Sequence, residues 1–187
     1  MRDHEGFTPL YYAAGGGCVE CVQLLLKAGA QASGRSNKGR TPLFVAGPLV
    51  AAVLIAAGTD IHATDLAASR PLHHSYHPVV LPAGVNACDQ FGFTPLHYAA
   101  LKADEKGVAW LLAQGADASA QSTAPYGHTD GLGPGWGREQ VHVLAAGSRP
   151  YDLAAWQHER SRFSTGRFRT TLEMLDKITP RRGVFSR

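Results

Sequence analysis

The chain has 187 residues, of which 44% are hydrophobic and 18% are charged, a composition that excludes an intrinsically disordered protein. The formal net charge of +3 is too small to indicate a nucleic-acid-binding protein by itself. Residues 1–137 carry 8 basic and 10 acidic side chains, whereas residues 138–187 carry 10 basic and 5 acidic ones, so the C-terminal end is the basic end.

Signals for secretion and for membrane insertion are weak. The chain has three cysteines, and an odd, sparse number argues against a secreted disulfide framework. The first residues contain no apolar signal region. Residues 42–58 carry no charge, but this stretch is near the lower limit for a spanning helix and is interrupted by Gly47 and Pro48. We therefore expect an intracellular protein, cytoplasmic or nuclear, without a membrane span.

A short Thr-Pro-Leu segment recurs along the chain. It begins at Thr8, Thr41 and Thr94, and the first two copies are 33 residues apart. Poorer copies, in which arginine replaces the threonine, begin at Arg70 and Arg149. Threonine caps a helix N-terminus through its hydroxyl, and proline fits the first helical position because its missing N–H costs nothing there. Each copy therefore predicts a helix start. In the two copies without threonine, the serine that precedes the arginine could provide the cap.

An apolar run and then a glycine follow most copies. The glycines at the ends of these runs are Gly29, Gly58 and Gly115. A glycine just past an apolar helix suits the left-handed conformation of a helix C-terminus. Each unit is therefore predicted to consist of two short antiparallel helices, closed by the glycine and followed by an extended connector.

Three features agree in register: the Thr-Pro-Leu start, the leucine-rich second helix and the closing glycine, as in Gly115-Ala116-Asp117. By these motifs the chain resembles the ankyrin-repeat family over residues 3–121 and 147–179. The resemblance implies an all-α solenoid of about five helix-pair units, the third of them degenerate. The expected units cover residues 3–35, 36–64, 65–88 and 89–121, within a repeat region 1–121; a Gly/Pro-rich insertion (122–146), a capping repeat (147–179) and a basic tail (180–187) follow.

The second and third units are short. The step from Thr41 to its closing glycine is 17 residues, whereas the first and fourth units have 21, so four residues are missing from the first helix and the following turn. In the third unit, Pro78 and Pro82 predict the loss of the second helix. Because contacts between neighbouring repeats stabilise a solenoid, we expect residues 69–87 to be its weakest link.

The insertion and the last unit differ from the other units. Residues 125–137 are rich in glycine and proline and cannot hold a regular helix, although a binding role for this loop stays open. In the last unit, Leu172, Leu175 and Ile178 are expected to face inward. The residues between them are polar, as the outer face of a terminal repeat needs to be.

Two clusters could carry chemistry, but a structural interpretation is preferred for each. Cys18 and Cys21 could form half of a zinc site or a redox pair, yet no second Cys-x-x-Cys exists, and Cys21 falls where a small buried residue is expected. His73 and His77 have the spacing of a metal-binding pair. However, His73 and His97 both occupy the family's Thr-Pro-Leu-His position, where the resemblance implies a hydrogen bond within the turn. No catalytic motif is present, and we expect no enzyme, metal or cofactor.

The resemblance implies a protein–protein interaction module, in a scaffold, adaptor or targeting role, that binds through its concave face and connector tips. Phe7 and Phe93 hold equivalent positions just before a Thr-Pro, where the family usually places polar or variable residues. An exposed aromatic side chain is typical of a binding hot spot. The candidate partner-binding residues are Phe7, Lys38, Arg40, Gln90, Phe91, Phe93 and Lys102. We expect the partner to be another protein, bound by a monomer.

Two other functions stay open. The chain could be the regulatory or targeting fragment of a larger enzyme. Alternatively, its basic end could bind nucleic acid or another anionic partner, although a solvated, charged cap is the preferred interpretation. The arginines of this end are Arg160, Arg162, Arg167, Arg169, Arg181 and Arg182.

Overall fold

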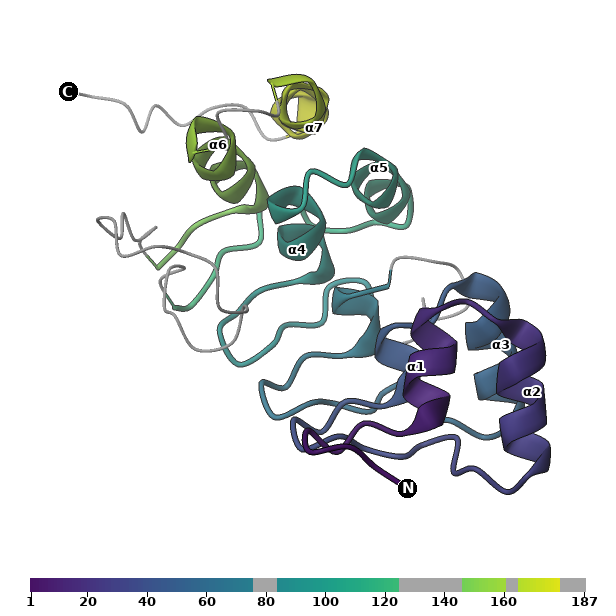
Figure 1. The fold of residues 1–187 in the computed structure, drawn as a ribbon. Helices are drawn as coiled ribbons and strands as arrows, with labels where there is room; N and C mark the ends of the chain where they lie inside the picture. Colours follow the sequence, from purple (N-terminus) through teal and green to yellow (C-terminus); the bar gives the residue numbers. More distant parts are fainter. Residues whose placement is uncertain (76–83, 125–145, 161–164, 179–187) are drawn as a thin grey trace.

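The computed structural model describes residues 1–75, 84–124, 146–160 and 165–178 (Figure 1). Within these ranges the chain is helical and contains no strand. Its α-helices are α1 (Pro9–Gly15), α2 (Val19–Lys27), α3 (Pro48–Ala56), α4 (Pro95–Leu101), α5 (Glu105–Ala113), α6 (Pro150–Arg160) and α7 (Thr165–Ile178). Two 3-10 turns, η1 (Pro42–Phe44) and η2 (Pro71–His73), complete the described elements. The prediction of an all-α fold is confirmed.

The recurring Thr-Pro segments start helices, as predicted, but the expected hydroxyl cap is absent at Thr41, which makes no side-chain cap hydrogen bond to η1. The Thr8 hydroxyl accepts the N–H of Tyr11 at 3.2 Å, and a proline opens α1, η1, η2 and α4. The proposed serine cap of the third unit is wrong, because Arg70 occupies the N-cap position of η2, where no side-chain cap hydrogen bond is present. The Ser69 N–H instead donates to the carboxylate of Asp65, at 3.0 Å, so this serine belongs to the connector.

Left-handed backbone recurs at three places in the units: the finger, the turn between the two helices and the closing glycine. The closing glycines Gly29, Gly58 and Gly115 have φ between +84° and +86°, as expected for helix C-termini. Two alanines also adopt positive φ, Ala68 at 58° and Ala103 at 49°. Because a Cβ disfavours this conformation, both alanines carry backbone strain.

The helices form two rows (Figure 1). In the inner row, α1 contacts η1, η1 contacts η2, η2 contacts α4 and α4 contacts α6. In the outer row, α2 packs against α3 and α5 packs against α7. The shortening of the second unit falls where it was predicted, since its inner helix is reduced to η1 and Pro48 starts α3 directly after Gly47. Residues 76–83, to which the loss of the third unit's second helix was assigned, lie outside the described residues.

The buried apolar residues that the structure describes form two clusters. The N-terminal cluster runs from Leu10 to Leu72, and the C-terminal cluster runs from Leu96 to Leu175. Trp110, on α5, packs against both of them. Val85 packs against the C-terminal cluster, so the two clusters meet between Leu72 and Val85 in the described part of the chain. A weak link at residues 69–87 stays a prediction. No helix in the described part of the chain is long and apolar enough to cross a membrane.

In the last unit, α6 and α7 pack against each other and against the fourth unit. Leu175 is fully buried and Leu172 packs against the C-terminal cluster, as predicted. Ile178 is 53% exposed, so the expectation that it faces inward is wrong. It is the last residue of α7, beyond the turn that contacts the core.

Candidate protein-binding surface

Each unit begins with a tight turn, which we call a finger. The five fingers comprise residues 3–7, 36–40, 65–69, 89–93 and 122–148. In the fourth finger, the Asp89 N–H donates to the Phe93 carbonyl at 3.0 Å and the Gly92 N–H donates to the Asp89 carbonyl at 3.1 Å. The same two backbone bonds close the other four fingers.

The described ends of the predicted insertion belong to the fifth finger. The Ser122 N–H donates to the Ser148 carbonyl at 2.9 Å, and the Gly147 N–H donates to the Ser122 carbonyl at 2.7 Å. These are the two bonds that close every finger, so residues 122–124 and 146–148 form the base of the fifth finger. Residues 125–145, which form most of the predicted insertion, lie outside the described residues.

Acidic side chains hold three of the fingers in shape. One oxygen of Asp3, Asp65 and Asp89 accepts two backbone N–H groups of its own finger, at 2.8–3.0 Å. The second oxygen accepts the Tyr12 hydroxyl in the first finger, the Arg40 guanidinium in the third and the Tyr98 hydroxyl in the fourth. These carboxylates are therefore committed to the fold and are not free to bind a partner.

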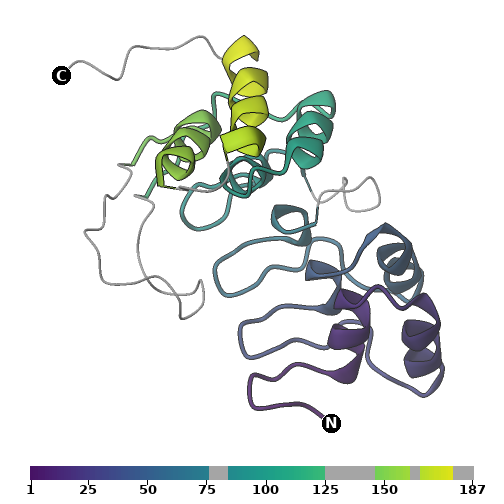
Figure 2. The same cartoon turned by 45° about the horizontal axis from the view of Figure 1, so that its top comes forward.

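Neighbouring fingers are joined by a ladder of backbone hydrogen bonds. The ladder bonds run from the N–H of Asn37 to the carbonyl of Glu5, from Leu66 to Lys38, from Gln90 to Ala67 and from Thr123 to Phe91, all at 2.9–3.0 Å. The Arg35 guanidinium adds a bond to the Thr64 carbonyl at 2.7 Å. The first three fingers accordingly lie side by side in Figure 2, and the bonds from Gln90 and Thr123 extend the row to the fifth. The finger row is continuous through the short second and third units.

The tips of the third and fourth fingers expose apolar side chains. Leu66 is 76% exposed at the third tip, and Phe91 is 39% exposed at the fourth. Lys38 and Gln90 are exposed beside them, and Lys102 is exposed at the end of α4. On α1, Tyr12 is 58% exposed and its ring lies 6.0 Å from that of Phe7. Fingers two to four therefore present apolar and basic side chains together.

Four of the predicted contact residues, Lys38, Gln90, Phe91 and Lys102, are exposed as the prediction requires. The prediction is wrong for Phe93, which is 5% exposed. Its ring lies 5.4 Å from that of His97 and 5.9 Å from that of Tyr98, so it belongs to the packing of the fourth unit.

Phe7 and Arg40 have mainly structural contacts. Phe7 is half-buried and its ring lies 4.3 Å from that of Tyr11. The Arg40 guanidinium binds the buried Asp65 carboxylate at 3.1 Å, and its own side chain is 34% exposed. Arg40 therefore joins the second finger to the third, and the structure gives its guanidinium a role in the fold.

The two histidines of the Thr-Pro-Leu-His positions connect successive units. His73 accepts the Arg70 N–H through Nδ1, and its Nε2 lies 3.2 Å from the Phe93 carbonyl of the next unit. His97 accepts the Thr94 N–H through Nδ1, and its Nε2 lies 3.1 Å from the Ser148 carbonyl. Burial lowers the pKa of His73 and lowers the pKa of His97 to about 4, so both rings are neutral at pH 7. The expected bond within the turn is present, and a bond to the following unit accompanies it.

Comparison with known families agrees with this repeated architecture. A family model described as ankyrin repeats (3 copies) matches residues 1–65, and a model described as ankyrin repeat matches residues 91–123. Together the two matches cover more than half of the chain. The chain belongs to the ankyrin-repeat family. Ankyrin repeats are generally protein–protein interaction modules and are typically non-enzymatic. The stretch between the matches contains the short third ankyrin unit.

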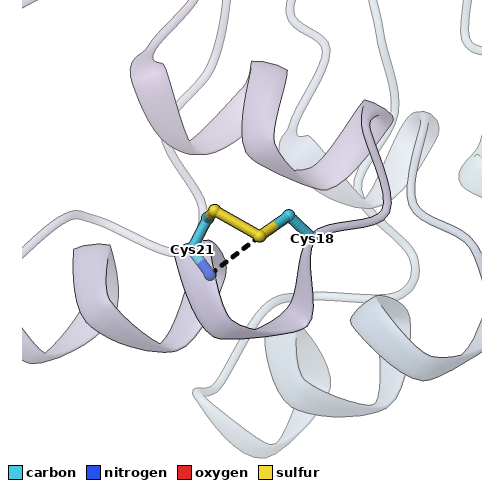
Figure 3. The surroundings of a disulfide bond; sticks show 2 residues. All are labelled: Cys18 and Cys21. Carbon is cyan, nitrogen blue, oxygen red and sulfur yellow. Dashed lines mark hydrogen bonds between the residues drawn. A yellow bond between two sulfur atoms is a disulfide. The ribbon is translucent and has the colours of Figure 1, made fainter.

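The structural interpretation of the Cys-x-x-Cys pair is wrong. Cys21 is exposed instead of buried, and Cys18 and Cys21 form a disulfide (Figure 3). The first turn of α2 directs Cys21 away from the ankyrin core, whereas Val22, one residue further on, is fully buried.

Metal and anion sites receive little support from the described residues. No group of three or more histidine, cysteine, aspartate or glutamate side chains among them could hold a metal ion. His77, the second member of the possible metal pair, lies outside the described residues. At the basic end, Arg169 is exposed and its guanidinium lies 3.1 Å from the Glu173 carboxylate. The side chains of the other five arginines lie outside the described part of the chain.

Sequence reasoning missed two exposed contact candidates. Leu66 follows from the register, because it stands four residues before Arg70 just as Gln90 stands four before Thr94. Tyr12 had no such signal, because Tyr12 and the equivalent Tyr98 both donate to the aspartate of their finger, yet Tyr98 is only half-exposed. Tyr98 is covered by the preceding unit, since its ring lies 5.8 Å from the rings of His73 and His74.

Proposed function

We propose that this ankyrin protein binds a partner protein along the tips of its second, third and fourth fingers. The observation that carries the proposal is the exposure of Leu66 and Phe91 at successive tips of a row that backbone hydrogen bonds hold rigid. A large apolar side chain on a rigid turn loses little conformational entropy on binding and gains from leaving water. Tyr12, at the N-terminal end of the row, extends the surface.

The charges around these tips favour a partner with acidic and apolar side chains. Lys38 lies beside Leu66 along the ladder, and Lys102 is exposed on the inner helix of the fourth unit. The nearby carboxylates of Asp65 and Asp89 are buried and hydrogen-bonded. A basic rim around an apolar centre increases the association rate of an acidic partner and selects against a basic one.

Two double variants with matched exposed surfaces test the proposal. In the first, Leu66→Ala and Phe91→Ala remove the apolar tips. In the control, Leu24→Ala and Leu49→Ala remove leucines that are 66% and 74% exposed on the outer helices α2 and α3. Quantitative mass spectrometry after affinity capture identifies proteins that bind the native chain and the control but not the tip variant.

With such a partner purified, the tip variant should bind at least about 30-fold more weakly, which corresponds to about 2 kcal/mol for a hot-spot pair. The control should bind as the native chain does. If the tip variant captures and binds every partner as tightly as the control does, the finger row is not the binding surface.

The wider role belongs to the same proposal. We infer an adaptor or scaffold protein, monomeric and located in the cytoplasm or nucleus. Size-exclusion chromatography with light scattering tests the monomer, and fluorescence imaging of a tagged chain tests the location. The regulatory-fragment alternative makes a distinct prediction, because the partner would then be a catalytic domain encoded by the same reading frame.

A further inference from the structure

The disulfide between Cys18 and Cys21 lies at the start of the outer helix of the first unit (Figure 3). Cys18 is the residue that caps α2, and Cys21 is in the first turn of that helix. The Cys18 sulfur accepts the backbone N–H of Cys21 at 3.2 Å. The pair is therefore part of the helix cap and lies on a different element from the finger tips.

The fourth unit shows what this position favours. Asp104 caps α5, the counterpart of α2, and its carboxylate accepts the Gly107 N–H at 3.0 Å. In both units a residue with positive φ, Gly17 or Ala103, precedes the cap. The cap position thus holds an anion in one unit and a cysteine in the other. The unpaired N–H groups and the dipole of the helix N-terminus stabilise negative charge, so this site favours the thiolate of a reduced Cys18 over the thiol.

The pair is also open to solvent. Cys21 is exposed, Cys18 is half-buried, and the preceding Gly16 and Gly17 are exposed. A Cβ built on Gly17 would meet no atom within 4 Å. The acidic Glu20 in the same turn is exposed, where water screens its charge. An attacking or leaving thiol can therefore reach either sulfur.

We propose that Cys18 and Cys21 form a reversible dithiol–disulfide site that exchanges with low-molecular-weight disulfides such as glutathione disulfide. The Cys18 thiolate attacks one sulfur of the small disulfide, forms a mixed disulfide and releases the first thiolate. The Cys21 thiol loses its proton to solvent and attacks the Cys18 sulfur, which expels the second thiolate. In sum, the protein dithiol is oxidised to the disulfide while the small disulfide is reduced to two thiols; excess small thiol drives the reverse reaction.

The first experiment uses the full chain with Cys88→Ser, so that only the pair can react. The reduced protein is incubated in glutathione buffers of increasing oxidised fraction and analysed by mass spectrometry. We expect an intramolecular disulfide to form and to be reduced again when thiol is restored. Variants that also carry Cys18→Ser or Cys21→Ser should stop at the mixed disulfide with glutathione. If the pair accumulates no intramolecular disulfide in any buffer, the proposal is wrong.

The second experiment tests the role of the helix N-terminus. In the Cys88→Ser background, the rate of alkylation by iodoacetamide at pH 7 is measured for Cys18 in the Cys21→Ser variant and for Cys21 in the Cys18→Ser variant. Cys18 should react roughly threefold faster or more in the folded chain, and the difference should vanish in concentrated urea. Equal rates in the folded chain would remove the basis for assigning the attack to Cys18.

The variant Cys18→Asp controls for folding. It reproduces the cap that Asp104 provides in the fourth unit, so its circular dichroism and thermal unfolding should match those of the native reduced chain. It should form no intramolecular disulfide. An unfolded Cys18→Asp variant would show that the two caps are not equivalent and would contradict the comparison on which the site rests.

Discussion

The burial of Phe93 makes a testable distinction between core and binding surface. Phe93→Ala removes a ring that is 5% exposed and lies 5.4 Å from the ring of His97 and 5.9 Å from that of Tyr98. The backbone of residue 93 would keep its own bonds, since its N–H donates to Asp89 and its carbonyl lies 3.2 Å from Nε2 of His73. The substitution therefore removes packing alone.

Replacing a fully buried phenylalanine with alanine costs about 3–5 kcal/mol. Such a loss is a large part of the 5–15 kcal/mol that stabilises a typical domain. The neighbouring Phe91, 39% exposed and 6.5 Å from Phe93 between ring centroids, is the matched control, and Phe91→Ala should cost less than about 1 kcal/mol. Urea unfolding followed by circular dichroism compares the two variants with the native chain under identical conditions.

The partner-binding assay supplies the second readout. Phe91→Ala should weaken binding with little change in the urea midpoint, whereas Phe93→Ala should lower the midpoint strongly. If the Phe93→Ala variant unfolds at the same urea concentration as Phe91→Ala, the ring does not contribute to the core and the assignment of these two residues is reversed.

Three further predictions follow from the same structure. Burial lowers the pKa of His97 from 6.5 to about 4, so as the pH falls the unfolded chain binds a proton at this residue before the folded chain does. The neutral ring therefore contributes about 3 kcal/mol to the free energy of unfolding above pH 6.5, and this contribution is lost as the pH falls toward 4. Urea midpoints at pH 7 and pH 4.5 measure the loss, which His97→Gln should make smaller. Ala68→Gly relieves a positive φ of 58° and should raise the free energy of unfolding by roughly 0.5–1 kcal/mol. Gly39→Ala should lower it, because φ there is 79° and a Cβ would lie 3.3 Å from the Asp65 backbone. Thermal unfolding of the two variants measures both changes. Trp110→Ala should cost about 3 kcal/mol and split a single urea transition into two, because Trp110 packs against both core clusters; a single transition after the substitution would mean that the finger row alone couples the two halves.

The helix boundaries could be predicted because single residues determine them. Threonine and proline at the start of α1 and α4 satisfy or remove N–H groups that the helix cannot bond, and the closing glycines adopt a φ that a Cβ disfavours. The loss of the second unit's inner helix was also visible, since Gly47 and Pro48 leave no room for it. These effects depend on single residues and their immediate neighbours, so the helix ends can be predicted from the sequence.

Burial at the candidate site could not be predicted in the same way. Phe7 and Phe93 stand at the same position of their fingers, yet Phe93 is buried and Phe7 is only half-buried. Tyr98, which lies 5.9 Å from the Phe93 ring, belongs to a unit with neighbours on both sides, whereas the first unit has a neighbour on one side. Such differences arise from packing between units, which a repeat motif does not encode.

The units are joined by hydrogen bonds between their fingers, whereas their interior is filled by apolar side chains. The inner helix of the second unit is reduced to η1, whereas its outer helix α3 has 9 residues, as α2 and α5 have. The described apolar core forms two clusters, one ending at Leu72 and the other beginning at Leu96. The finger row has no such division, because the ladder bonds and the bond between His73 and the Phe93 carbonyl cross the same boundary. An ankyrin array can thus shorten the inner helix of one unit and still hold its finger tips in register. A partner that contacts Leu66 and Phe91 spans this boundary, so its binding should stabilise the two halves against separation by mass action. The urea midpoint of the native chain should therefore rise with partner concentration, whereas the tip variant, Leu66→Ala with Phe91→Ala, should show no such rise.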